Sequence, residues 1–151
     1  MNWFERKQVL VPFDFSDACM AAVNVAIELA ENVADIHVLH VLETLPATSP
    51  LAIWDSDADE KRKTTVRTAM QESFSKLDIT NLHLDVTIGN PARAVADFAK
   101  EIDCGLIVIP SNSRSPLQRI FIGSVAERVV RLAPCPVLVL KSDELPNVAS
   151  S

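Results

Sequence analysis

Two short polar segments, each placed after an apolar run, carry the residue types best suited to chemistry. Asp14 comes directly after the run 9–13, and the serine-rich segment 111–115 follows the run 106–109. A carboxylate can accept hydrogen bonds from a ribose hydroxyl or an adenine amine, and serine hydroxyls with free backbone N–H groups can hold a phosphate. Both segments also have a structural interpretation, because Asp14 and Ser16 could cap the following turn or helix and serine is a common turn residue. The residue types therefore indicate a candidate nucleotide site, with the structural alternative open.

The elements that would position these segments follow from a regular alternation of strand and helix signals. Short β-branched or alternating runs predict strands at 9–13, 35–41, 82–88, 106–109 and 137–140. Helices are expected after the N-cap Ser16, over about 57–77, from Asn90 to about 102, and around Gly123 and Ser124. In the second of these, apolar residues recur at helical spacing, as Val66, Met70, Phe74 and Leu77.

Five strands interleaved with four helices predict an α/β fold, an open sandwich built on a doubly wound parallel sheet. Open sheets of this class bind ligands at the carboxyl ends of their strands. Asp14 and the segment 111–115 both follow predicted strands, so we expect them at that edge of the sheet.

Length and composition predict one soluble domain over residues 1–151, with an ordered core of about 7–142 and a polar C-terminal tail. A net charge of −6 argues against binding to nucleic acid or to an anionic membrane surface. The apolar run near the N-terminus is too short for a signal peptide or a membrane span, so a cytoplasmic location is expected.

The cysteines and histidines give little support for a metal site or for catalysis. Cys19, Cys104 and Cys135 form no C-x-x-C pair, which indicates neither a disulfide framework nor a zinc site. Cys19 lies near a predicted helix start, where a thiol can become reactive, but buried and inert thiols are favoured for all three. His37, His40 and His83 lack metal-ligand spacing, and no Ser/His/Asp set can be argued. An enzymatic function is therefore not favoured.

Five short motifs occur in order along the chain, at 9–16, 40–41, 89–91, 123–129 and 133–139. Each is a weak signal alone, but their order and spacing together resemble the universal stress protein family over nearly the whole chain. The resemblance implies a five-stranded sheet of order 3-2-1-4-5 in a soluble, cytoplasmic protein that is usually a homodimer.

Many members of that family bind ATP through the motif Gly-x-x-Gly-x9-Gly-Ser/Thr. Here Pro110 and Ser113 stand at the first two glycine positions, and only Gly123 and Ser124 remain. Proline fixes φ and offers no N–H, whereas glycine lets the backbone approach a ligand closely. Beside them, Arg114 is either a phosphate donor or a solvated loop residue. Gly123 and Ser124 could equally be small residues that let the helix pack closely.

If a nucleotide binds, the resemblance places its contacts at Pro12, Asp14, Val41, Ile109, Pro110, Ser113, Gly123, Ser124 and Val125, and Arg114 is added for its charge. The lost glycines favour a regulatory module of stress adaptation, with weakened or absent ATP binding and an unknown protein client. The alternative is a competent ATP or AMP sensor, using Mg²⁺, with slow hydrolysis or self-phosphorylation.

Two further segments indicate contact surfaces. In the strand order of the family the last strand lies at a sheet edge, where apolar residues need a partner. Family members pair this edge across a two-fold axis, so the resemblance implies a homodimer interface at Val137, Leu138, Val139 and Leu140. The connection 43–55 carries Leu51, Ile53 and Trp54, which is unusually apolar for a linker. It could be a lid or touch a second subunit, but packing against the second helix is favoured.

Overall fold

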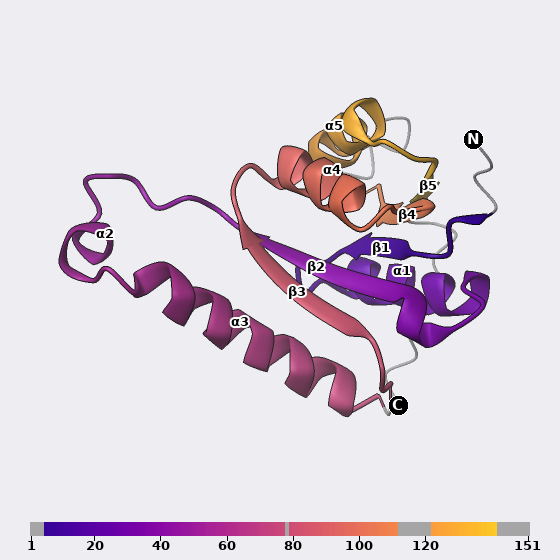
Figure 1. Cartoon of the computed structure of the whole chain (residues 1–151), viewed down its shortest axis with the longest axis horizontal. Coiled ribbons are helices and arrows are strands. Elements are labelled where there is room, and N and C mark those ends of the chain that lie inside the picture. The colour runs from indigo at the N-terminus through magenta and orange to yellow at the C-terminus, as the bar shows by residue number, and fades with distance from the viewer. Residues whose placement is uncertain (1–4, 78, 112–121, 142–151) are drawn as a thin grey trace.

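A computed structural model describes residues 5–77, 79–111 and 122–141 of the chain. It contains a five-stranded sheet of order β3-β2-β1-β4-β5, in which every neighbouring pair is parallel (Figure 1). The strands are β1 Val9–Pro12, β2 Ile36–Leu42, β3 His83–Ile88, β4 Leu106–Pro110 and β5 Val137–Leu140. The predicted fold class and strand order are confirmed.

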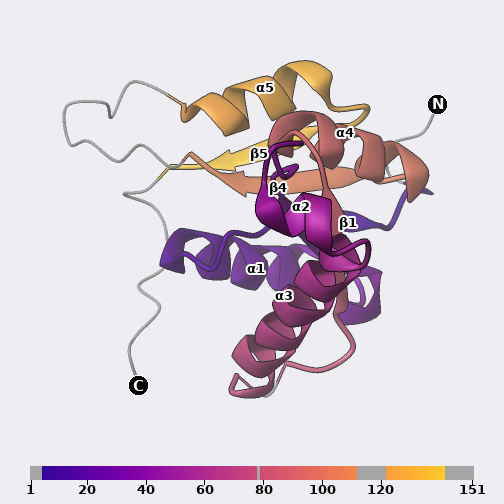
Figure 2. The same cartoon turned by 90° about the vertical axis from the view of Figure 1, so that its left-hand side faces the viewer.

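Four longer helices cover the sheet, two on each face: α1 Asp17–Leu29, α3 Ala58–Ser75, α4 Pro91–Glu101 and α5 Ser124–Leu132. Helices α4 and α5 lie on one face and α1 and α3 on the other (Figures 1 and 2). A short 3-10 helix, Val33–Asp35, precedes β2. Among the described helices, none is long and apolar enough to cross a membrane.

The predicted helix starts have the expected capping bonds. The Cys19 N–H donates to Ser16 Oγ over 3.2 Å, and the Arg93 N–H donates to Asn90 Oδ1 over 3.3 Å, with Pro91 in the first turn. Helix α5 differs, because Gly123 is its N-cap and no side chain caps it. Its N-cap residue therefore binds none of the first N–H groups through a side chain.

Strand alternation produces two apolar layers. Val9, Val11, Ile36 and Val38 pack toward α1 and α3, where Met70 and Phe74 are buried. On the other face, the layer against α4 and α5 contains Leu10, Leu39, Val95, Ile107, Ile109 and Val129. The expected apolar stripe of α3 is correct at Met70 and Phe74 but wrong at Leu77, which is exposed because the helix ends at Ser75.

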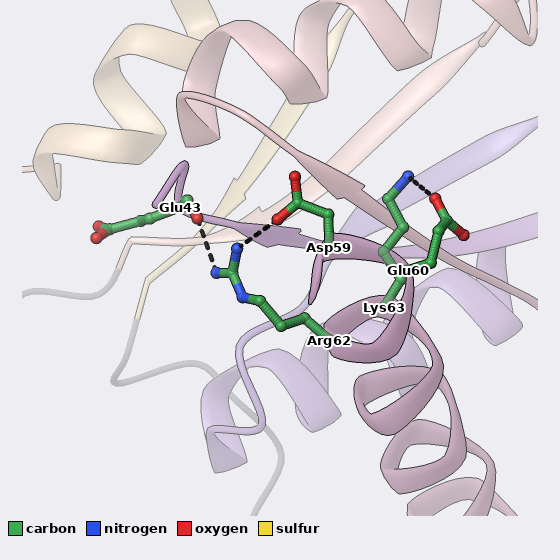
Figure 3. Close-up of polar contacts among 5 residues, drawn as sticks. All are labelled: Glu43, Asp59, Glu60, Arg62 and Lys63. Carbon is green, nitrogen blue, oxygen red and sulfur yellow. Dashed lines mark hydrogen bonds and ion pairs between the residues drawn. The ribbon is translucent and has the colours of Figure 1, made fainter. Parts of the chain in front are cut away.

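The connection 43–55 differs from the expectation, because it contains a further short helix, α2 Pro50–Trp54. One turn with Pro50 at its start is too short to show helical periodicity. The connection is tied to α3 by two polar contacts. Arg62 donates to the Glu43 carbonyl oxygen over 2.8 Å and also pairs with Asp59 of its own helix over 3.1 Å (Figure 3), and Lys61 donates to Asp55 over 2.7 Å. Its apolar side chains stay exposed, Trp54 at 85%.

Candidate functional site

A cavity of about 700 Å³ opens at the carboxyl ends of the central strands. Strands β1 and β4 pair in register at Val9↔Leu106 and Leu10↔Ile107. Past these pairs, the strand ends Pro12 and Pro110 line the cavity together with the starts of α4 and α5. The cavity therefore lies where the chain leaves β1 toward one side of the sheet and β4 toward the other, which is the expected ligand position in this architecture.

The structure brings the predicted site residues together wherever it describes them. The cavity is lined by Pro12, Asp14, Val41, Ile109, Pro110, Gly123, Ser124 and Val125. Ser113 and Arg114 lie outside the described residues. Contact of this set with a nucleotide stays a prediction.

Asp14 begins a tight turn at the mouth of the cavity. Its Oδ1 accepts a hydrogen bond from the Ser16 N–H over 2.9 Å. Between them, Phe15 has φ of 65°, a left-handed conformation that costs a bulky residue about 1–3 kcal/mol. The centroid of the Phe15 ring lies 5.0 Å from that of Phe13 and 5.4 Å from that of His40, and these ring contacts help to hold the turn. Asp14 therefore has the structural role left open by the sequence and also lines the cavity.

Sequence reasoning missed part of the lining. These residues are Phe13, Cys19, Leu39, His40, Pro91, Val95, Ile122, Ala126 and Glu127. Leu39 and His40 directly precede Val41 on β2, so that strand end carried a usable signal. His40 is fixed by its Nδ1, which donates to the Phe13 carbonyl oxygen over 2.7 Å. Glu127 lies one turn into α5, and no spacing in the sequence indicates that it reaches the cavity.

The start of α5 is fixed to the ends of β4 and β5 by backbone hydrogen bonds. The Gly123 N–H donates to the Ser111 carbonyl oxygen over 2.7 Å, and the Ser111 N–H donates to the Leu140 carbonyl oxygen over 2.9 Å. These bonds hold Ser124 and Val125, in the uncapped first turn, at the cavity wall. The backbone N–H groups of a first helical turn and the positive end of a helix dipole favour an anion at this position.

The charges on the described lining oppose a polyphosphate. Asp14 and Glu127 are its charged members, and both are acidic. Glu127 is balanced in part by Arg131, whose Nη2 donates to the Glu127 carboxylate over 2.7 Å. Pro110 contributes no N–H. The described part of the cavity thus suits an apolar ring and hydroxyl groups better than several phosphates.

The described residues that line the cavity give little support for catalysis. Burial raises the pKa of the Cys19 thiol to about 12, so this sulfur stays protonated and is a poor nucleophile near neutral pH. The Nδ1 of His40 is engaged by the backbone. Within the described ranges, no group of three or more histidine, cysteine or acidic side chains is arranged to hold a metal ion. The arrangement can bind a small molecule, and it offers no nucleophile–base pair among these residues.

Comparison with known proteins identifies the family. The model of the universal stress protein family matches residues 5–141. A universal stress protein of Methanocaldococcus jannaschii is 30% identical over 143 residues, which cover 89% of this chain and 82% of the relative.

Solved structures agree with this assignment. The universal stress protein UspA of Lactobacillus plantarum superposes with a TM-score of 0.66 at 26% identity, covering 89% of this chain and 98% of its own. A universal stress protein of Archaeoglobus fulgidus, solved in complex with dAMP, shares the fold with a TM-score of 0.57 at 21% identity, covering 89% of this chain and 97% of its own. The match over residues 5–141, with the sheet order and the cavity at its carboxyl edge, shows that the chain belongs to the universal stress protein family.

Proposed function

We propose that this universal stress protein is a cytoplasmic regulatory module of stress adaptation that binds adenine nucleotides weakly and acts as a homodimer. Family membership supports the role in the stress response. The observation that carries the weak binding is the composition of the cavity. Its adenine and ribose end has apolar walls and the Asp14 carboxylate as an acceptor, whereas Glu127 and Pro110 stand where phosphates would need donors.

The adenine and ribose end is supported by shape and chemistry. Pro12, Val41 and Ile109 supply apolar walls, and the Asp14 carboxylate supplies an acceptor for a hydroxyl or an amine. A volume of about 700 Å³ falls within the range of small-molecule sites. The relative from Archaeoglobus fulgidus in complex with dAMP has the same fold, which is consistent with a nucleoside monophosphate here.

The end of the cavity that would hold the triphosphate should bind it weakly, for two reasons. Pro110 stands where the family motif has glycine, so one backbone donor is absent and a close approach is blocked. Each lost hydrogen bond costs about 1 kcal/mol, so two or three losses would weaken binding roughly tenfold to a hundredfold. The Glu127 carboxylate adds repulsion.

A competent ATP or AMP sensor is the second candidate. It is favoured by the predicted contact residues that line the described part of the cavity, and by the start of α5, where a first helical turn offers N–H groups to one phosphate. Such a sensor would use Mg²⁺ to balance the phosphate charge and could hydrolyse ATP slowly or phosphorylate itself. The affinities for ATP and AMP distinguish the two candidates.

Isothermal titration of ATP and AMP, with and without Mg²⁺, tests the proposal. We expect ATP to bind with a Kd of about 100 μM or weaker, and AMP to bind at least as well as ATP. Asp14→Ala should weaken AMP binding about tenfold, since it removes the acceptor at the ribose end. The matched control is Asp97→Ala, which removes an equal charge from an exposed position of α4 outside the cavity. ATP binding tighter than about 10 μM would favour the sensor instead.

Restoring the motif glycine gives a second prediction. In Pro110→Gly the chain regains an N–H and conformational freedom at the end of β4, so ATP affinity should rise about fivefold to tenfold. Titration of ATP into both proteins measures the change, and Pro136→Gly, directly before β5 and outside the cavity lining, controls for the loss of a proline next to a strand. An unchanged affinity in Pro110→Gly would remove Pro110 as the cause of weak binding.

A further inference from the structure

Cys104 and Cys135 meet at the amino edge of the sheet, opposite the nucleotide cavity. Cys104 lies between α4 and β4, and Cys135 lies between α5 and β5. These strands are parallel neighbours, with Ile107 in register with Val137. Both cysteines are buried in the same apolar cluster on the α4 and α5 face. The topology thus brings together two thiols that are far apart in the sequence.

One peptide group links the two cysteine segments. The Cys104 thiol donates to the Leu106 carbonyl oxygen over 3.1 Å, and the N–H of the same peptide, from Ile107, donates over 3.1 Å to the carbonyl oxygen of Pro136, the residue after Cys135. Each thiol also shifts the pKa of the other. The two side chains are therefore neighbours within the buried cluster.

The surroundings make the two thiols unequal. Cys135 is 9% exposed, whereas Cys104 is fully buried. The neighbouring Cys104 thiol and the Arg6 guanidinium also lower the pKa of Cys135, while the Cys135 thiol and burial raise the pKa of Cys104. The Arg6 side chain is 17% exposed and is held by Asp103 over 3.2 Å. Cys135, the more accessible thiol, is therefore the nucleophilic member, and Cys104 is placed as the resolving thiol.

We propose that Cys104 and Cys135 form a peroxide-reactive pair that closes reversibly to a disulfide. The Cys135 thiolate attacks one oxygen of hydrogen peroxide, the O–O bond breaks, and a sulfenic acid forms while hydroxide leaves and takes up a proton as water. Cys104 then loses its proton and attacks the Cys135 sulfur, so that the S–S bond forms, the S–O bond breaks and a second water leaves. Peroxide gains the two electrons that the thiols lose, and an external dithiol reverses the step. This redox function is separate from nucleotide binding.

The direct test treats the whole protein with equimolar hydrogen peroxide, blocks free thiols with N-ethylmaleimide under denaturing conditions, and maps the digest by mass spectrometry without reduction. We expect a peptide pair that links Cys104 to Cys135, lighter by two hydrogens than the reduced pair and lost on treatment with dithiothreitol. Cys19 lies in the cluster on the other face of the sheet, so Cys19→Ser should leave the yield unchanged. Recovery of both thiols in the reduced form would overturn the proposal.

Variants assign the two roles. Cys104→Ser should leave a sulfenic acid at Cys135 that dimedone captures, whereas Cys135→Ser should leave Cys104 unoxidised. Arg6→Gln should slow the reaction about threefold to tenfold, because loss of the guanidinium raises the pKa of Cys135 and lowers its thiolate fraction. Arg6→Lys keeps the charge and should restore most of the rate. Capture of a sulfenic acid at Cys104 in place of Cys135 would reverse the assignment and contradict the geometry.

Discussion

Gly105→Ala is expected to destabilise the fold by about 3 kcal/mol, which chemical denaturation should show as a large fall in the unfolding midpoint. A methyl group at this position would lie 2.4 Å from the Arg6 carbonyl oxygen and 2.8 Å from Arg6 Cβ. Backbone atoms cannot move aside as a flexible side chain would. The Gly105 N–H also donates to the Gln8 carbonyl oxygen over 2.9 Å, so a shift would disturb the start of the β1–β4 pairing.

Gly89→Ala is the matched comparison, because the two glycines are needed for different reasons. Gly89 has φ of 156°, but an added methyl would lie an ordinary 3.8 Å from Ala94 Cβ. The cost there is conformational and should be about 1 kcal/mol. Equal losses in the two variants would show that the contact with Arg6 relaxes at little cost and would contradict the prediction.

The parts of the fold that could be predicted depend on local chemistry. Ser16 and Asn90 marked helix starts because a side-chain oxygen next to an apolar pattern can bind the first N–H groups, and both do so. Leu77 was misplaced because helical spacing says nothing of where the last turn ends. The helix α2 was missed because a single turn has no period to detect.

In the candidate site, too, only residues with a local sequence signal could be predicted. Asp14 and Pro110 could be placed because Asp14 comes just after β1 and Pro110 ends β4, and the carboxyl ends of these strands share one edge of the sheet. Glu127 could not be placed, because its approach to the cavity depends on the rotation of α5 against the sheet. The meeting of Cys104 and Cys135 depends on β4 and β5 being neighbours and on the length of the turns before them. Such tertiary contacts leave no spacing in the sequence.

The second large effect is expected at the proposed dimer edge, where β5 is the terminal strand of the sheet. Leu138 is 37% exposed on this strand, whereas Val139 packs against the core, so a charge at Val139 would also damage the fold. Leu138→Glu should therefore weaken the dimer without destabilising the fold of the protomer. In a two-fold interface each substitution occurs twice, and a carboxylate buried without a partner costs several kcal/mol.

These terms predict that Leu138→Glu raises the dimer dissociation constant about a thousandfold, equivalent to about 4 kcal/mol, and yields a monomer at micromolar concentration in sedimentation velocity. Leu29→Glu is the matched control: the same substitution at a 53% exposed position, near the end of α1 and away from β5. It should leave the dimer intact. An unchanged dimer in Leu138→Glu, with the fold preserved in both variants, would place the interface elsewhere.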